Sequence, residues 1–211
     1  MPTRFFEKTK RFDCEEELRN AFDCASINLS QHGQLLLDGR IKINHNVTFS
    51  GNCEIHNDCE IGIGSVLDNV ILGAFSQIKP YSVLESVICG KSCILGPFCF
   101  IRCGTKIGDH CILGAHLEVT RSSIGDRVKI SHQGFVGDGK IDNDVVLGSG
   151  TVFCNWDGTQ KNTTIIGQRT SIGSGTMIIA PCNVGSEVVI GAGSVIKGDV
   201  KNNERIIQKR K

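Results

Sequence analysis

The stretch KIGDHCILGAHLEV, residues 106–119, decides the fold of this protein because its pattern repeats every six residues. Ile107, Leu113 and Val119 lie six residues apart, and glycine follows the first two of them. Cys111, a small residue, stands four residues after Ile107. This period matches neither the 3.6 of an α-helix nor the 2 of an ordinary strand.

The same pattern, with a few steps of five, runs through most of the chain. Its apolar positions are Ile43, Phe49, Ile55, Ile61, Leu67, Leu72, Ile78, Leu84, Cys89, Leu95, Ile101, Ile107, Leu113, Val119, Ile124, Ile130, Val136, Ile141, Leu147, Phe153, Ile166, Ile172, Ile178, Val184, Ile190 and Ile196. A small or β-branched residue often follows four residues later. One inward aliphatic and one inward small side chain per six residues is typical of a parallel β-helix.

The sequence therefore predicts an all-β protein, a parallel β-helix of hexapeptide repeats. Three repeats make one triangular coil, and the repeats predict about eight coils over residues 41–200. Residues 1–40 are expected to form an N-terminal helical, capping segment, with Asp13 as N-cap, Glu16 completing a capping box, and Leu18, Ala21 and Phe22 on one helical face. Residues 201–211 are expected to form a basic tail.

One segment interrupts the repeat. The step from Phe153 to Ile166 takes 13 residues instead of six. Residues 154–165 are therefore expected to leave the body as an inserted loop, which carries the only tryptophan, Trp156. Such a loop is either a tolerated surface insertion or a place where a rigid scaffold carries binding residues.

The chain holds eleven cysteines, which raises the question of disulfides or a metal site. Six of them occupy the small slot of the repeat: Cys53, Cys59, Cys93, Cys99, Cys111 and Cys182. Reduced thiols behave as small apolar groups, so we expect core filling in a reducing compartment. There is no CxxC motif, and the spacing of His110, His116 and His132 does not suggest a metal site, so no metal is expected.

Charge and hydropathy exclude some kinds of partner. Lys plus Arg (23) nearly equals Asp plus Glu (22), which argues against capture of nucleic acid or of an anionic membrane surface. No stretch approaches the ~20 apolar residues of a membrane span, and no signal peptide is evident. We expect a soluble, cytoplasmic protein.

The stretch KISHQGFVGDG, residues 129–139, contains the histidine of most interest. His132 is the third residue of its repeat, so its side chain is expected to face outward or into a corner. An exposed histidine is often no more than a turn residue. Glycines at 134, 137 and 139 allow a ligand to approach the backbone closely, which favours a functional role.

Longer motifs point to a family. From about Ile41 to Val200 the chain resembles the C-terminal half of the bifunctional enzyme that acetylates glucosamine-1-phosphate and then uridylylates the product. The motifs that carry the resemblance are KPYSVLE, GPFCFIR, KISHQGFVGD, GSGTVFCNWDGTQK and IGSGTMIIAP followed by VVIGAGSVIKGDV. The resemblance implies a left-handed helix, a homotrimer, and an acetyl-CoA-dependent N-acetyltransferase whose active sites lie between neighbouring solenoids.

The resemblance also implies a role for individual residues. His132 is the expected general base, a task that suits imidazole at neutral pH, and Glu118 is the acid expected to orient it. The expected contacts to the sugar phosphate are Arg102, Asn155, Trp156 and Lys161. The expected contacts to acetyl-CoA are Ser174, Ala192 and Lys209, with the backbone N–H at Ser149 as a donor to the thioester oxyanion.

Three positions depart from the family pattern. Thr120 stands in place of a phosphate-binding lysine, although Arg121 is adjacent, Phe135 replaces a tyrosine, and Val146 replaces an asparagine. Losing such polar contacts costs about 1 kcal/mol or more each. Two alternatives therefore stay open: an acyltransferase with a different acceptor, or a trimeric solenoid that binds ligands or partners without catalysis.

No glycine-rich nucleotide signature precedes the repeat, so uridylylation is not expected of this chain. The expected product enters UDP-N-acetylglucosamine synthesis for cell-envelope precursors. A separate nucleotidyltransferase protein then supplies the uridylyl step, unless the chain is a fragment or a diverged paralogue.

Overall fold

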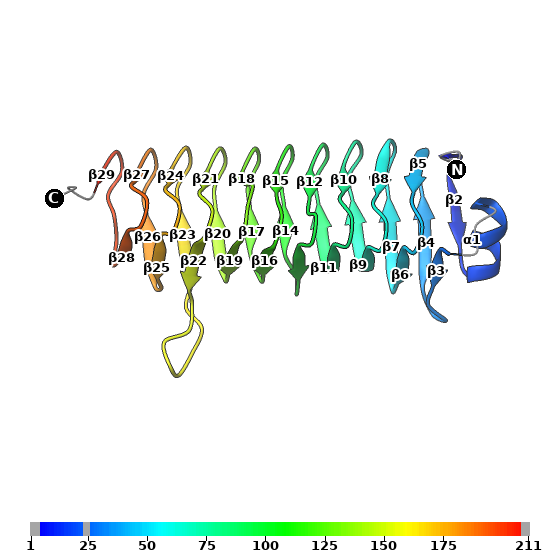
Figure 1. Ribbon diagram of the computed structural model, residues 1–211, viewed down its shortest axis with the longest axis horizontal. Coiled ribbons are helices and arrows are strands. Elements are labelled where there is room, and N and C mark those ends of the chain that lie inside the picture. The colour runs from blue at the N-terminus through cyan, green and yellow to red at the C-terminus, as the bar shows by residue number, and fades with distance from the viewer. Residues whose placement is uncertain (1–4, 23–25, 208–211) are drawn as a thin grey trace.

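The repeat folds into a parallel β-solenoid that is triangular in cross-section. The computed structural model describes residues 5–22 and 26–207. Its coils stack along one long axis, with helix α1 (Glu15–Phe22) at one end and strand β29 (Arg205–Ile206) at the other (Figure 1). Three sides, each built from one strand per coil, form the walls. Among the described residues, no helix is long and apolar enough to cross a membrane.

The first side is a sheet of eleven strands, of which all but the antiparallel β1 (Phe5–Glu7) run parallel. The parallel strands are β5 (Arg40–Ile43), β8 (Cys59–Ile61), β10 (Gln77–Ile78), β12 (Ile94–Leu95), β15 (Ile112–Leu113), β18 (Lys129–Ile130), β21 (Val146–Leu147), β24 (Ser171–Ile172), β27 (Val189–Ile190) and β29. Each marks one coil, so the described solenoid has about ten coils rather than the expected eight.

The second side lies between the first and the third in the order in which the chain winds around the solenoid. Its strands are β3 (Asn28–Leu29), β6 (Thr48–Ser50), β9 (Val66–Leu72), β11 (Val83–Cys89), β13 (Phe100–Arg102), β16 (Leu117–Thr120), β19 (Gly134–Gly137), β22 (Thr151–Cys154), β25 (Met177–Ile179) and β28 (Val195–Lys197). Strands β9 and β11 continue around the corner into the third side.

The third side closes the triangle. Besides the second halves of β9 and β11, it contains β4 (Gln34–Leu37), β7 (Asn52–Ile55), β14 (Lys106–Ile107), β17 (Ser123–Ile124), β20 (Gly139–Ile141), β23 (Thr164–Ile166) and β26 (Cys182–Val184). We call the corner between the first and second sides the first corner, that between the second and third sides the second corner, and the remaining one the third corner.

The N-terminal segment differs in part from the expectation. The period of six already begins at Leu29 and Leu35, so β3 and β4 belong to the first coil although they precede residue 41. Strand β2 (Lys10–Phe12) pairs with β4 in antiparallel fashion and covers that otherwise open edge. Helix α1 buries Leu18 and Phe22, as predicted.

Two details of the predicted helix are wrong. Ala21 is exposed rather than part of the buried face. The helix begins at Glu15, and the N–H of Leu18 donates to the carbonyl of Cys14, so Cys14 and not Asp13 is the residue before the first turn. Helix ends are poorly marked by sequence when several acidic residues follow one another.

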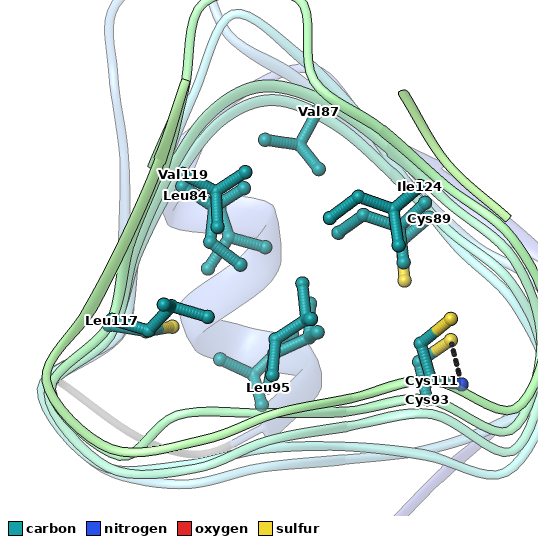
Figure 2. Close-up of a cluster of buried hydrophobic side chains, with 14 of the residues drawn as sticks. Leu84, Val87, Cys89, Cys93, Leu95, Cys111, Leu117, Val119 and Ile124 are labelled. Atoms are coloured by element: carbon teal, nitrogen blue, oxygen red, sulfur yellow. Dashed lines mark hydrogen bonds between the residues drawn. The ribbon is translucent and has the colours of Figure 1, made fainter. Parts of the chain in front are cut away.

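The inward positions of the repeat are confirmed. All the apolar positions of the period are buried, and the small slots beside them are buried as well. Figure 2 shows side chains of this kind pointing from the three walls into one interior, with Cys93 and Cys111 stacked in adjacent coils. The N–H of Cys111 donates to the sulfur of Cys93 at 3.4 Å. The small side chains at these positions thus fill the space that the larger side chains leave in the core.

The cysteines of the small slot are free thiols in the core, as expected. Burial raises the pKa of the Cys53 and Cys99 thiols to about 11. A thiol with a raised pKa is a poor nucleophile and a poor metal ligand. Among the described residues, no group of three or more His, Cys, Asp or Glu side chains gathers as it would around a metal ion.

Candidate functional site

The first corner aligns four of the candidate residues. On the first side, Lys129, Val146, Ser171 and Val189 form one continuous ladder of paired strands. His132, Ser149, Ser174 and Ala192 each follow a member of that ladder by three residues, so they lie on the same corner in successive coils. The expected base and three of the expected acetyl-CoA contacts therefore share one edge of the molecule.

The turns of this corner leave backbone donors unpaired. The N–H of Gly148 donates to the carbonyl of Ile172 at 2.8 Å, and that of Gly150 donates to Gln133 at 2.7 Å. The N–H of Ser149, between them, has no backbone acceptor among the described residues. The same holds for the N–H groups of Ser174 and Ala192 in the next two coils. A short row of available donors thus extends from the coil that follows His132.

His132 itself is exposed, in a turn just before β19. Within residues 5–22 and 26–207, its imidazole has no hydrogen-bond or ion-pair partner. No bond joins it to Glu118. Both ring nitrogens are therefore open to solvent or to a ligand, and the orienting contact expected from Glu118 is not formed in this structure.

Glu118 instead holds Arg102. Its Oε1 accepts from Nη2 of Arg102 at 2.7 Å and from Nε at 3.3 Å. The guanidinium also lies over the ring of Phe100, 5.0 Å from its centre. In the ladder of the second side, Glu118 stands between Phe100 and Phe135. Arg102 is thus held at a defined place on the second side, two coils from Phe135.

The second corner holds a cluster of hydrogen-bonded polar side chains around Asp138. Asp138 accepts a two-point contact from Arg121, with Nε at 2.7 Å and Nη2 at 2.9 Å, and a further bond from Nδ2 of Asn155 at 2.5 Å. Nη1 of Arg121 donates to the hydroxyl of Thr120 at 3.0 Å. The Arg121 guanidinium, and to a lesser degree Asn155, hold the pKa of Asp138 below its usual range.

This cluster changes the interpretation of two candidates. Thr120 is only 1% exposed, and its hydroxyl is engaged by Arg121. Asn155 is 8% exposed and directed to Asp138. Both side chains are therefore engaged by partners within the chain. Asp138 was not among the predicted site residues, although it ends the KISHQGFVGD motif, which was the signal available in the sequence.

The inserted loop is an ordered arm. It leaves the body between β22 and β23 and projects away from the coils (Figure 1). Trp156 and Lys161 form an isolated antiparallel bridge across it. Asp157 caps its turn by accepting from the N–H groups of Thr159 and Gln160, each at 2.8 Å, and these backbone bonds lower the pKa of Asp157.

The arm and the remaining candidate residues lie apart from the first corner. Trp156 is 58% exposed. Val146 is 42% exposed and faces outward from β21 on the first side. Lys209 lies outside the described residues. Within one chain, therefore, the candidates fall into separate groups: the first corner, the second side with the second corner, the first side, and the arm.

Comparison with known protein families identifies the kind of repeat that builds the solenoid. The sequence model of a protein family described as bacterial transferase hexapeptide (six repeats) matches residues 86–121 and 163–198. The chain thus contains the repeats of the hexapeptide transferases.

Particular relatives are proteins called bifunctional protein GlmU. The chain is 37% identical to that of Baumannia cicadellinicola over 177 residues, which are 84% of this chain and 38% of the relative. It is 36% identical to that of Aromatoleum aromaticum over 188 residues, 89% of this chain and 41% of the relative. The chain thus spans about two fifths of the length of the curated relatives it matches.

Among solved structures, that of LpxA from Acinetobacter baumannii is similar with a TM-score of 0.48 and 16% identity, covering 75% of this chain and 67% of that chain.

Proposed function

We propose that this chain is an acetyl-CoA-dependent N-acetyltransferase that acts on glucosamine-1-phosphate or a closely related amino-sugar phosphate. The observation that carries the proposal is the open imidazole of His132 on the same corner as Ser149, Ser174 and Ala192. The relationship to the GlmU proteins and the resemblance to their acetyltransferase half support the same reaction.

The corner suits the chemistry of acetyl transfer. A sugar ammonium must lose a proton before its nitrogen attacks a thioester, and a neutral imidazole at His132 accepts that proton. The amine then forms the new N–C bond, the C–S bond breaks, and coenzyme A leaves as a thiol after taking up a proton. Negative charge develops on the carbonyl oxygen in between, where the unpaired N–H of Ser149 is available as a donor.

The phosphate group of the acceptor sugar would bind to Arg102 on the second side of the solenoid. Arg102 presents a guanidinium held by Glu118 and Phe100, and guanidinium groups bind phosphate in a planar, two-point manner. We assign Glu118 as the residue that positions Arg102. Phe135, next to Glu118 in the ladder, offers an apolar surface to the sugar.

In the proposed homotrimer, the active site forms between neighbouring copies of this chain. The arm with Trp156 and Lys161 projects away from its own solenoid, and Val146 lies on another side than Arg102. A homotrimer of parallel solenoids brings such separated groups to one cleft. The product is then a substrate for uridylyl transfer in the cytoplasm.

The activity is tested by thiol release from acetyl-CoA in the presence of glucosamine-1-phosphate. We expect His132→Ala to lower the rate by about 10²- to 10⁴-fold, the usual contribution of a general base. His110→Ala is the matched control, since His110 is also an exposed turn histidine but lies on the third corner. The proposal fails if the purified wild-type protein is no faster than His132→Ala.

Ligand binding is tested separately by thermal unfolding. Acetyl-CoA at 100 times its dissociation constant should stabilise the folded protein by about 2.7 kcal/mol. An unchanged melting curve with saturating acetyl-CoA would favour a solenoid without catalysis.

One observation favours a second candidate, an acyltransferase with a different acceptor. Thr120 is buried and bonded to Arg121, so the phosphate contact expected at this position is lost. Val146 presents only an apolar surface. A panel of amino sugars with and without a phosphate distinguishes the two, because only the first candidate requires the phosphate.

A further inference from the structure

A hollow beyond the second corner lies away from His132 and the first corner, and Arg121 is the one predicted site residue that lines it. It has a volume of about 320 Å³ and opens on the third side. Its lining includes Lys106, Ser123 and Lys140 from the third side, Arg121 and Asp138 from the second corner, and Thr163 from the base of the arm. Small-molecule sites usually begin at about 300 Å³, so the hollow holds more than a single water or ion.

The two lysines share a ladder with one serine between them. Lys106 pairs in register with Ser123, and Ser123 with Lys140. Neighbouring strands are about 4.8 Å apart, so the two lysine Cα atoms are separated by about 10 Å. All three residues are exposed. Flexible lysine stems can therefore approach one ligand from both ends while the serine hydroxyl lies at its middle.

The lysines are unpaired, in contrast to other charged groups on this surface. On the third corner, Arg127 forms a two-point contact with Asp144, and Arg169 is bonded to Glu187. Neither Lys106 nor Lys140 has an ion-pair partner in the part of the chain that the structure describes.

The nearby carboxylates do not cancel this positive charge. Asp138 is satisfied by Arg121 and Asn155, and Glu118 by Arg102. Arg121 and Asp138 both line the hollow and neutralise one another, and Lys161 acts electrostatically on Asp138 from the arm. Lys106 and Lys140 are therefore the two lining cations whose charge is not compensated by a carboxylate of the described residues.

We propose that this hollow, the Lys106–Lys140 pocket, binds the diphosphate group of a small molecule. Two flexible lysine side chains that start from Cα atoms about 10 Å apart can bend toward one another and bind the two phosphates of one diphosphate, and Ser123 and Thr163 add hydroxyl donors. The ligand is either free pyrophosphate or a diphosphate ester such as a nucleoside diphosphate. The pocket is separate from the acetyl-transfer corner, so the proposal does not depend on that activity.

Calorimetric titration tests the pocket with inorganic phosphate, pyrophosphate and UDP as separate probes at low ionic strength. We expect pyrophosphate or UDP to bind more tightly than inorganic phosphate. The doubly substituted variant Lys106→Ala with Lys140→Ala should weaken that binding by about tenfold or more, because charge-assisted bonds are lost at both ends. UDP binding much tighter than pyrophosphate identifies an ester as the ligand, and equal binding identifies the free ion.

The matched control is Lys129→Ala, which removes an exposed lysine from the same coil as Lys140 but on the first side. It should leave the dissociation constant within about twofold of the wild-type value, and adding 0.3 M salt should weaken binding through screening. Since the lysines are exposed, the variants are expected to fold, and circular dichroism checks this. Absence of pyrophosphate and UDP binding, or equal loss in the control and double variants, overturns the proposal.

Discussion

At the scale of single residues, the second corner shows contacts within the chain that the sequence did not predict. Arg121, the cation beside Thr120, makes a two-point contact with Asp138 and a bond to Thr120. Asn155 joins the same carboxylate. The sequence offers no hint of this, because the partners meet only through the stacking of one coil on the next.

The contact at Asp138 makes stability depend on pH. Since Arg121 and Asn155 lower the pKa of Asp138 in the folded state, its stabilising contribution is present above the unfolded value of about 3.9 and is lost as the pH falls through the folded value. Asp138→Asn should lower the free energy of unfolding at pH 7 by about 1–3 kcal/mol. Urea unfolding at pH 7 and pH 3 should show a smaller difference for the variant than for the wild type.

Asp144→Asn is the matched control for that experiment. Asp144 forms the same kind of two-point contact, with Arg127, but both partners are exposed. Water and salt screen such a pair, so its removal should cost less at pH 7. Equal losses at pH 7 in the two variants would contradict the structural role given to Asp138.

At the scale of elements, the inward and outward positions of a strand carry very different energies. In β15, Leu113 is fully buried, whereas its neighbour Ile112 faces outward and is partly exposed. Adjacent side chains of a strand point to opposite faces, so two isomeric residues of one strand provide a matched pair.

Leu113→Ala should lower the free energy of unfolding by about 2–5 kcal/mol because it leaves a cavity in the interior. Ile112→Ala should cost much less. Equilibrium unfolding in urea measures both, and a larger loss for Ile112→Ala would mean that the register of β15 is wrong.

At the scale of the whole molecule, the solenoid is a one-dimensional stack in which each coil contacts mainly its neighbours. The N-terminal cap closes one end. Phe12 of β2 is fully buried, pairs in register with Leu35, and has its ring 5.5 Å from that of Phe6.

Substitution of Phe12 should therefore destabilise mainly the coils next to the N-terminal cap. In Phe12→Ala, we expect faster amide hydrogen exchange in β4 and β7, close to the cap, and unchanged exchange in β24 and β27, many coils away. Hydrogen exchange with mass spectrometry measures both regions in one sample. Uniformly faster exchange along the chain would show that the coils unfold as one unit.

Much of this architecture follows from the sequence. Ile107, Leu113 and Val119 were assigned to the interior from spacing alone, and the arm was found as the one long interruption of the period. The coil number was too low because Leu29 and Leu35 keep the period within a segment that had been assigned to the cap. The start of α1 was missed because Asp13 and the glutamates after it offer several possible first turns.

The sequence by itself determined the β-solenoid and its buried positions, because one aliphatic and one small inward side chain every six residues are typical of short strands stacked in coils around a single core. It also singled out His132. Only the tertiary structure decided which residues meet, since contacts between coils depend on register and on the outward rotamers, which a period does not encode. For that reason three features appear only in the folded molecule. They are the row of backbone N–H groups on the same corner as His132, the ion pair between Arg102 and Glu118, and the alignment of Lys106 and Lys140 on either side of Ser123.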